Sequence, residues 1–196
     1  LRWLTSLLIM GCALPVTAVF EVSGGSARAS SVGGAFTAVA PDVGAVWYNA
    51  AVNARAQDLK VGTTHALLYP GLDGTLSLNA LSAAVPLGGG SAQVGLSTLD
   101  FSDWQEQIVA MGYGRPLHPR VAVGGTIRSS GWRTSGISHR SWSADVGATY
   151  ELGWLHYNTY VRLGAAVRNI TGANVSAGGY EAGETPRAFS VGAAVD

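Results

Sequence analysis

Residues 141–152 alternate between polar and apolar side chains at every position, and this feature restricts the fold of the chain more than any other. Successive side chains of a β-strand point to opposite faces, so the pattern predicts a strand with one face in an apolar medium and the other in water. The run is longer than the ~5–6 residues of an average strand and fits the ~9–11 tilted residues with which a strand crosses a bilayer. Its apolar face carries Trp142, Ala144, Val146, Ala148, Tyr150 and Leu152.

Similar alternating segments recur along the chain, separated by compact turn sequences rich in Gly, Pro and Asp. This succession is typical of a membrane barrel, in which short turns at one rim alternate with longer loops at the other. We predict an all-β fold, a transmembrane antiparallel β-barrel of which about eight strands are present. The expected strands are residues 58–69, 75–87, 91–99, 105–115, 120–131, 141–152, 159–170 and 187–196, and the expected longer loops are residues 132–140 and 171–186.

The composition favours an exported membrane protein over a partner of nucleic acid. Hydrophobic residues make up 47% of the chain and charged residues 12%, and the formal net charge is +0, so no basic surface for nucleic acid is expected. Residues 1–18 resemble a secretory signal peptide, with Arg2, an apolar core and small residues at positions 16–18. We expect this segment to be removed, together with Cys12, and the mature protein to lie in the bacterial outer membrane.

Four charged residues fall on the polar faces of expected strands, namely Arg128, Asp145, Arg162 and Arg168. An arginine that faces lipid near the middle of the membrane costs about 2–4 kcal/mol, so these side chains are expected to face the lumen or to lie near the interface. Arg128, Asp145 and Arg162 come from three consecutive strands and would be able to pair across the lumen wall. Two interpretations stay open: a structural ion pair inside the barrel, or a charge cluster that selects a substrate.

Eight large aromatic residues lie mostly at the ends of expected strands or in adjoining loops. Such positions are typical of the interfacial girdles of a membrane barrel. Soluble sandwiches also carry aromatics near strand ends, so the placement supports a barrel without deciding for it. These residues are Trp104, Trp132, Trp142, Trp154, Tyr113, Tyr150, Tyr157 and Tyr160.

Residues 19–57, the N-terminal segment, lack the two-residue period and are rich in small side chains. Such a stretch suits glycine-dependent turns and short helical pieces, which indicates a plug or cap in a confined space. The segment resembles the N-terminal signature of the PorV/PorQ-type outer-membrane proteins and of the related FadL-type fatty-acid transporters. The resemblance is carried by Ser26-Ala27-Arg28-Ala29, residues 33–40, Asp42 and Ala45-Val46-Trp47-Tyr48-Asn49, and more weakly by residues 163–170 and 185–192. The chain departs from the family pattern at Asn49-Ala50-Ala51, where the family carries Asn-Pro-Ala.

The resemblance implies a barrel of about fourteen strands around a small N-terminal plug, whereas the alternating segments number about eight. An eight-stranded barrel is only wide enough for its own side chains and cannot also enclose the N-terminal segment. Three arrangements stay open: residues 58–196 are part of a longer barrel, the N-terminal segment lies outside a small barrel, or several chains combine. We expect the first, because the alternation is still running at residue 196.

The resemblance also implies a function, the passage of hydrophobic small molecules across the outer membrane, with lipid as the surrounding partner and no cofactor. PorV-type relatives act instead with a protein secretion apparatus, for which the two longer loops would be docking surfaces. A secreted soluble β-sandwich is a third alternative. The candidate plug residues are Arg28, Phe36, Val39, Val46, Trp47 and Asn49, among which the four apolar ones would form either a ligand relay or simple packing against the wall.

No residue pattern indicates catalysis or a metal site. The four histidines share no ligand spacing, and HExxH, CxxC and paired-carboxylate patterns are absent from the sequence. Ser26 lacks the G-x-S-x-G surroundings of a nucleophile elbow. We therefore expect a protein that is not an enzyme.

Overall fold

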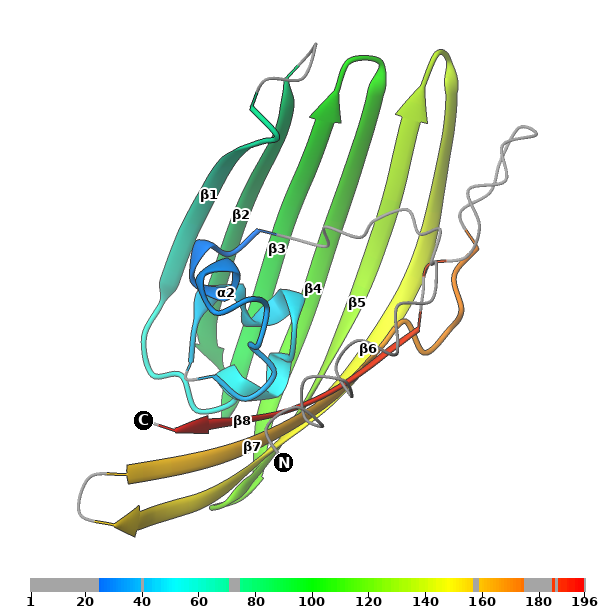
Figure 1. Ribbon diagram of the computed structural model, residues 1–196. Helices are drawn as coiled ribbons and strands as arrows, with labels where there is room; N and C mark the ends of the chain where they lie inside the picture. The colour runs from blue at the N-terminus through cyan, green and yellow to red at the C-terminus, as the bar shows by residue number, and fades with distance from the viewer. Residues whose placement is uncertain are drawn as a thin grey trace, which may run out of the picture.

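A single antiparallel sheet dominates the structure, a computed structural model that describes residues 25–39, 41–70, 75–156, 159–174, 185 and 187–195. Its eight strands follow one another in sequence order, each hydrogen-bonded to the next (Figure 1). The prediction of an all-β fold with eight antiparallel strands is confirmed. The strands are β1 (Lys60–Leu68), β2 (Leu76–Leu87), β3 (Gly90–Phe101), β4 (Trp104–His118), β5 (Val121–Thr134), β6 (Ile137–His156), β7 (Thr159–Arg168) and β8 (Ala188–Val195).

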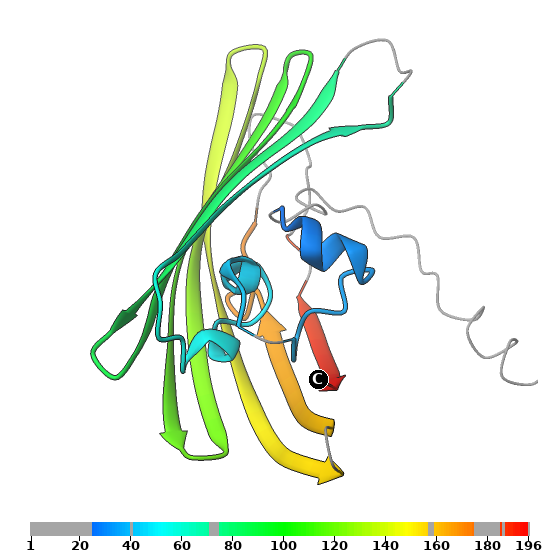
Figure 2. The same cartoon turned by 90° about the vertical axis from the view of Figure 1, so that its left-hand side faces the viewer.

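The sheet curls into a half-barrel, and the described part of the N-terminal segment lies on its concave face (Figure 2). Within the described strands no ladder joins β1 to β8, so the eight strands do not close on themselves. The open sheet leaves room for the N-terminal segment, which a closed eight-stranded barrel would not. The expected signal peptide, residues 1–18, lies outside the described residues.

The described part of the N-terminal segment contains three short helical pieces, and each begins at a side chain that caps it. They are α2 (Ala27–Ser31) and the 3₁₀ helices η1 (Val43–Trp47) and η2 (Ala50–Asn53). The preceding residues, Ser26, Asp42 and Asn49, accept hydrogen bonds from the backbone N–H groups of the first turns. Such caps satisfy donors that a short helix cannot pair internally. None of the helices in the described ranges has the length and apolar character needed to cross a membrane.

The connection between β5 and β6 differs from the sequence prediction. Residues 132–140 were expected to form a long loop, but both strands continue through most of this range and leave only Ser135 and Gly136 as the turn. Both turn residues have positive φ, 40° and 86°, as tight two-residue hairpins require. The prediction of a long loop was wrong because the apolar residues change face here. Trp132 and Ile137 lie on the concave face, whereas Arg133, Ser138 and Arg140 occupy the face that is apolar in residues 141–152, and this hides the two-residue period. Most of the other expected long loop, residues 171–186, lies outside the described residues.

The convex face of the sheet carries a continuous apolar band. One row of directly paired residues crosses β2 to β6 as Ala83, Val94, Met111, Ile127 and Ala144. Along β6 the face opposite the N-terminal segment carries Trp142 and Val146, as the alternation predicts, and both are exposed. Toward the turns that follow β3 and β5, the band ends at a polar row of paired residues, Thr98, Gln107, Gly131 and Arg140.

The concave face of the sheet is the wall on which the N-terminal segment lies. Glycines of this wall let the backbone of the segment contact the strands directly. A Cβ atom added at Gly124 would lie 2.5 Å from the backbone nitrogen of Ala51. At Gly147 it would overlap the side-chain oxygen of Asn49, and at Gly164 the carbonyl oxygen of Thr37. These three glycines lie on the neighbouring strands β5, β6 and β7. At each of these contact positions no side chain separates the strand from the segment. The chain contains 27 glycines, and close packing against the N-terminal segment explains part of this number.

This packing predicts opposite effects for two adjacent glycines of β5. Gly124→Ala should lower the free energy of unfolding in detergent by about 1–3 kcal/mol, because the new methyl group overlaps the backbone of η2. The matched control is Gly125→Ala, whose Cβ would face the other side and meet only the carbonyl oxygen of Asp145 at 3.5 Å. That variant should be neutral or slightly stabilising. Denaturant titration followed by circular dichroism would measure both, and equal stability of the two variants would contradict the proposed contact.

Candidate functional site

The centre of the concave face holds a buried ion pair between β5 and β6. Arg128 Nε donates to Asp145 Oδ2 at 2.5 Å, and the two side chains are only 7% and 8% exposed. Another nitrogen of the guanidinium, Nη2, reaches the N-terminal segment, where it donates to the carbonyl oxygen of Trp47 at 2.8 Å. The guanidinium also lies over the Trp47 ring, 5.9 Å from its centroid. The pair therefore connects the wall to the segment rather than facing open solvent.

Asp145 also connects this pair to the end of β7. Its other oxygen, Oδ1, accepts a hydrogen bond from the backbone N–H of Asn169 at 2.8 Å. The preceding residue, Arg168, interacts electrostatically with Asp145, Arg128 and Tyr48. Burial raises the pKa of the Tyr48 hydroxyl above its ordinary value, and the charges of Arg168 and Arg128 act in the opposite direction. Three of the four predicted lumen charges thus lie together around Tyr48.

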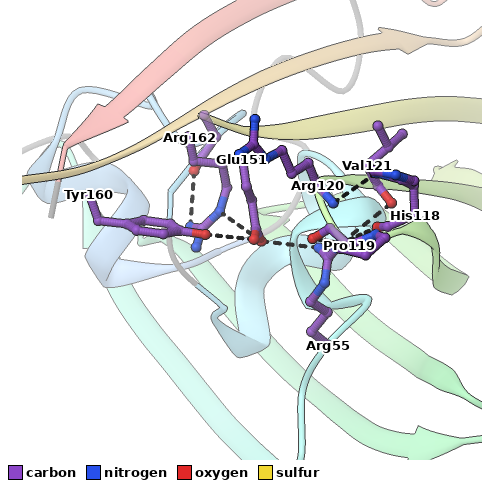
Figure 3. A network of polar contacts seen from close by, with 9 residues as sticks. Arg55, His118, Pro119, Arg120, Val121, Glu151, Tyr160 and Arg162 are labelled. Atoms are coloured by element: carbon purple, nitrogen blue, oxygen red, sulfur yellow. Dashed lines mark hydrogen bonds and ion pairs between the residues drawn. The ribbon is translucent and has the colours of Figure 1, made fainter. Parts of the chain in front are cut away.

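The fourth predicted lumen charge, Arg162, belongs to a separate cluster near the β4–β5 turn (Figure 3). Its Nε lies 3.9 Å from Glu151 Oε1, and its Nη1 donates to the carbonyl oxygen of Ala38 at 3.5 Å. The structure therefore does not bring Arg162 into the Arg128–Asp145 pair. Hairpin geometry explains the difference, because Glu151 is the residue of β6 directly opposite Arg162.

Sequence reasoning missed the other members of this second cluster. Arg55, at the end of the N-terminal segment, donates to Glu151 Oε1 at 3.0 Å and to the carbonyl oxygens of His118 and Pro119 at 2.8 and 2.9 Å. Tyr160 donates its hydroxyl to Glu151 Oε2 at 2.5 Å. Figure 3 shows how these groups converge on one carboxylate. The available signal was Glu151 itself, a charge on the polar face of the most regular strand.

The predicted plug residues differ in how deeply they are buried. Phe36, Val46 and Trp47 have no exposed surface, whereas Val39 is half-buried. Trp47 lies against Gly95 and donates its indole N–H to Ser82 Oγ at 2.9 Å. Arg28 is exposed and pairs with Asp42 at 3.2 Å, so it contacts the segment itself. Buried as they are, the three apolar side chains pack against the wall or against the segment.

Asn49 is the most highly connected of the predicted plug residues. Its side-chain nitrogen donates to the carbonyl oxygen of Thr37 at 2.8 Å and to those of Ala148 and Ala165 on the wall at 3.2 and 3.5 Å. Its side-chain oxygen caps η2 by accepting from the N–H of Ala51 at 3.1 Å. One amide group thus links two parts of the segment to two strands.

An apolar strip runs along the concave face from the N-terminal segment to the rim formed by the β3–β4 and β5–β6 turns. Its buried members are Val46, Trp47, Ile108, Ala110 and Trp132, and the partly buried Tyr48, Trp104 and Ile137 pack against it. The rings of Trp104 and Trp132 stack with centroids 5.2 Å apart.

The position of this stack corrects the expectation that Trp104 and Trp132 belong to an outer girdle. Both share a face with concave residues of their own strands, Ile108 and Arg128, at even spacing along the chain. Trp142, Tyr113 and Tyr150, in contrast, are exposed on the convex face. Tyr157 lies outside the described residues.

The described residues contain no group of three or more His, Cys, Asp or Glu side chains that could hold a metal ion. The geometry of the concave face instead provides one buried ion pair, one partly exposed charge cluster around Glu151, and one apolar strip. Comparisons with known protein families, with curated proteins and with solved structures find no match for this chain.

The burial of the ion pair predicts a large effect of removing one charge. Asp145→Asn keeps an oxygen for the N–H of Asn169 but leaves the Arg128 guanidinium buried without an anion, which should lower the free energy of unfolding by about 3–5 kcal/mol. The control is Asp103→Asn in the exposed β3–β4 turn, where a change within about 0.5 kcal/mol is expected. Denaturant unfolding in detergent measures both variants. A loss no larger in Asp145→Asn than in the control would show that the pair does not hold the segment.

Proposed function

We propose that this chain forms part of the wall of a β-barrel in the bacterial outer membrane, and that the barrel lets hydrophobic small molecules pass. The membrane location is supported by the apolar band on the convex face. Met111, Trp142 and Val191 are 66%, 65% and 69% exposed there. Soluble monomers rarely expose a contiguous apolar surface of this kind, which argues against a secreted β-sandwich.

A larger barrel is the arrangement that best accommodates the open edges of the sheet. The outer edges of β1 and β8 carry backbone groups outside the ladders of the described sheet. In the hydrocarbon core each unsatisfied backbone group costs several kcal/mol, so a wall in lipid has to close. Further strands that pair with β1 and β8 would close it, in agreement with the barrel of about fourteen strands that the family resemblance implies.

The passage of hydrophobic molecules rests on one observation, the apolar strip on the concave face. An aqueous pore is expected to have a polar interior. Here Trp104, Trp132 and Ile137 lie at the rim, and the strip continues through Ile108 to Trp47. Trp104 and Ile137 are only partly buried, so a ligand that arrives at the rim would meet apolar surface at once. The strip ends on the N-terminal segment, which acts as a plug in this proposal.

One feature favours the alternative role, a component of a protein secretion apparatus. The N-terminal segment is fixed to the wall by buried hydrogen bonds and by the Arg128–Asp145 pair, an arrangement suited to a lumen that stays closed. The secretion role would need residues 132–140 as a long loop for docking a partner protein. The β5–β6 connection is instead a tight turn, which does not fit this requirement.

The proposal predicts that Trp104→Ala weakens ligand binding. A fluorescent long-chain fatty acid should bind the purified protein in detergent about tenfold more weakly in the variant, which corresponds to about 1.4 kcal/mol of lost contact. The control Trp142→Ala removes an equally large ring from the convex face and should leave the affinity unchanged. Circular dichroism verifies that both variants remain folded. If neither variant nor the unaltered protein binds the probe saturably, while deletion of the gene leaves uptake intact and a partner protein copurifies, the secretion role replaces this one.

A further inference from the structure

A groove of about 470 Å³ lies where β4, β5 and β6 extend beyond the apolar band. Its floor is Gly131 on β5, which has no side chain to fill the space between the neighbouring strands. The polar walls come from Gln105 and Gln107 on β4, Arg133 at the end of β5, and Ser138 and Arg140 on β6. The four longest of these side chains belong to the convex face. Trp132 and His139 complete the lining, and none of the lining residues belongs to the Arg128–Asp145 pair or to the Glu151 cluster.

The groove presents two guanidinium groups and no carboxylate among its lining residues. Gln105 and Gln107 orient them, because Arg133 Nη2 donates to Gln105 Oε1 at 2.9 Å and Arg140 Nη2 donates to Gln107 Oε1 at 3.1 Å. The nearest acid in this network is Asp100, whose carboxylate accepts a hydrogen bond from Gln105 Nε2 at 2.6 Å. Gln105 therefore lies between this carboxylate and the Arg133 guanidinium. A guanidinium has five N–H donors, so both arginines keep donors for an anion. Two adjacent guanidinium groups match the oxygens of a phosphate.

The apolar band begins immediately below the groove. Arg140 Nη1 lies 3.4 Å from Ser129 Oγ, and Ser129 is the residue directly paired with Trp142. Below this pair, Ile127 and Ala144 continue the band. The order along the strands is therefore cation, aromatic ring and aliphatic surface, which matches the phosphate headgroup, interface and acyl chains of a lipid in one leaflet.

We propose that this groove binds the phosphate headgroup of an anionic membrane lipid, with Arg133 and Arg140 as the groups that contact the phosphate. The proposal rests on the membrane location put forward above. A lipid is favoured over a free phosphate ion because the two arginines lie at the edge of the apolar band, which would contact the acyl chains.

Quenching of tryptophan fluorescence by brominated lipids tests the proposal on the full chain reconstituted in vesicles. Trp142 is the reporter, and the signal of Trp142→Phe is subtracted. Brominated phosphatidylglycerol should bind beside Trp142 more tightly than brominated phosphatidylcholine, by about fivefold for each arginine. The double variant R133Q/R140Q should bind the two lipids equally. The matched control is R115Q, which removes an exposed arginine of the same outer face near the opposite end of β4.

The outcomes separate this inference from the proposed function. Quenching by both lipids, with a preference for phosphatidylglycerol that R133Q/R140Q loses and R115Q keeps, supports the groove as the lipid site. Quenching by both lipids with no preference, or with one that R133Q/R140Q retains, overturns the lipid site and leaves the membrane location intact. Absence of quenching by either lipid overturns the membrane location itself, and the lipid site with it.

Discussion

Direct contact between the backbone of the N-terminal segment and the glycines of the wall is the constraint on which the rest of the structure depends. An irregular segment brings unpaired N–H and C=O groups, which have to be satisfied where it is buried. Gln93 donates to the carbonyl oxygen of Ala50 at 2.8 Å, and Asn49 donates to carbonyl oxygens of the wall. Those carbonyl oxygens can accept again because each has two lone pairs. Such hydrogen bonds form only at the short separation that Gly124, Gly147 and Gly164 allow.

The buried charges serve the same contact. Arg128 donates to Asp145 within the wall and to the carbonyl oxygen of Trp47 in the N-terminal segment, and a planar guanidinium suits this division because its donors point in fixed, divergent directions. A buried ion pair contributes little net stability compared with well-packed apolar side chains, since desolvation offsets most of the attraction. The pair is therefore better understood as fixing the position of the segment. Arg55 does the same at the segment's other end, where it joins Glu151 to the β4–β5 turn.

The two-residue period predicts the strands well and their ends poorly. Residues 141–152 lie within β6 as expected, because an apolar convex face and a polar concave face alternate along this strand. The period is lost at 132–140, where the apolar residues Trp132 and Ile137 lie on the concave face and the convex face is polar, and the extension of β5 and β6 was missed for that reason. The pairing of Arg162 with Glu151 depends on hairpin register and on a bulge between Glu151 and Gly153, which residue spacing alone does not reveal. The sequence does place Arg128, Asp145 and Arg168 on one face, since parity along a strand is enough for that.

The concave face changes character along the strands, and this asymmetry connects the fold to the proposed role. Near the β4–β5 turn the wall is lined by glycines, Gly114 and Gly124 among them, and η2 covers them at backbone distance. Toward the opposite rim the same strands carry Ile108, Trp104 and Trp132, and the described part of the N-terminal segment contributes Val46, Trp47 and Tyr48 to this apolar strip. At the end that the described part of the N-terminal segment does not cover, large apolar side chains leave no place for closely packed backbone. At the covered end, glycines leave no side chain for a ligand to contact. A hydrophobic molecule that entered from the rim would therefore stop at Trp47, and passage beyond it would have to run beside the fixed segment.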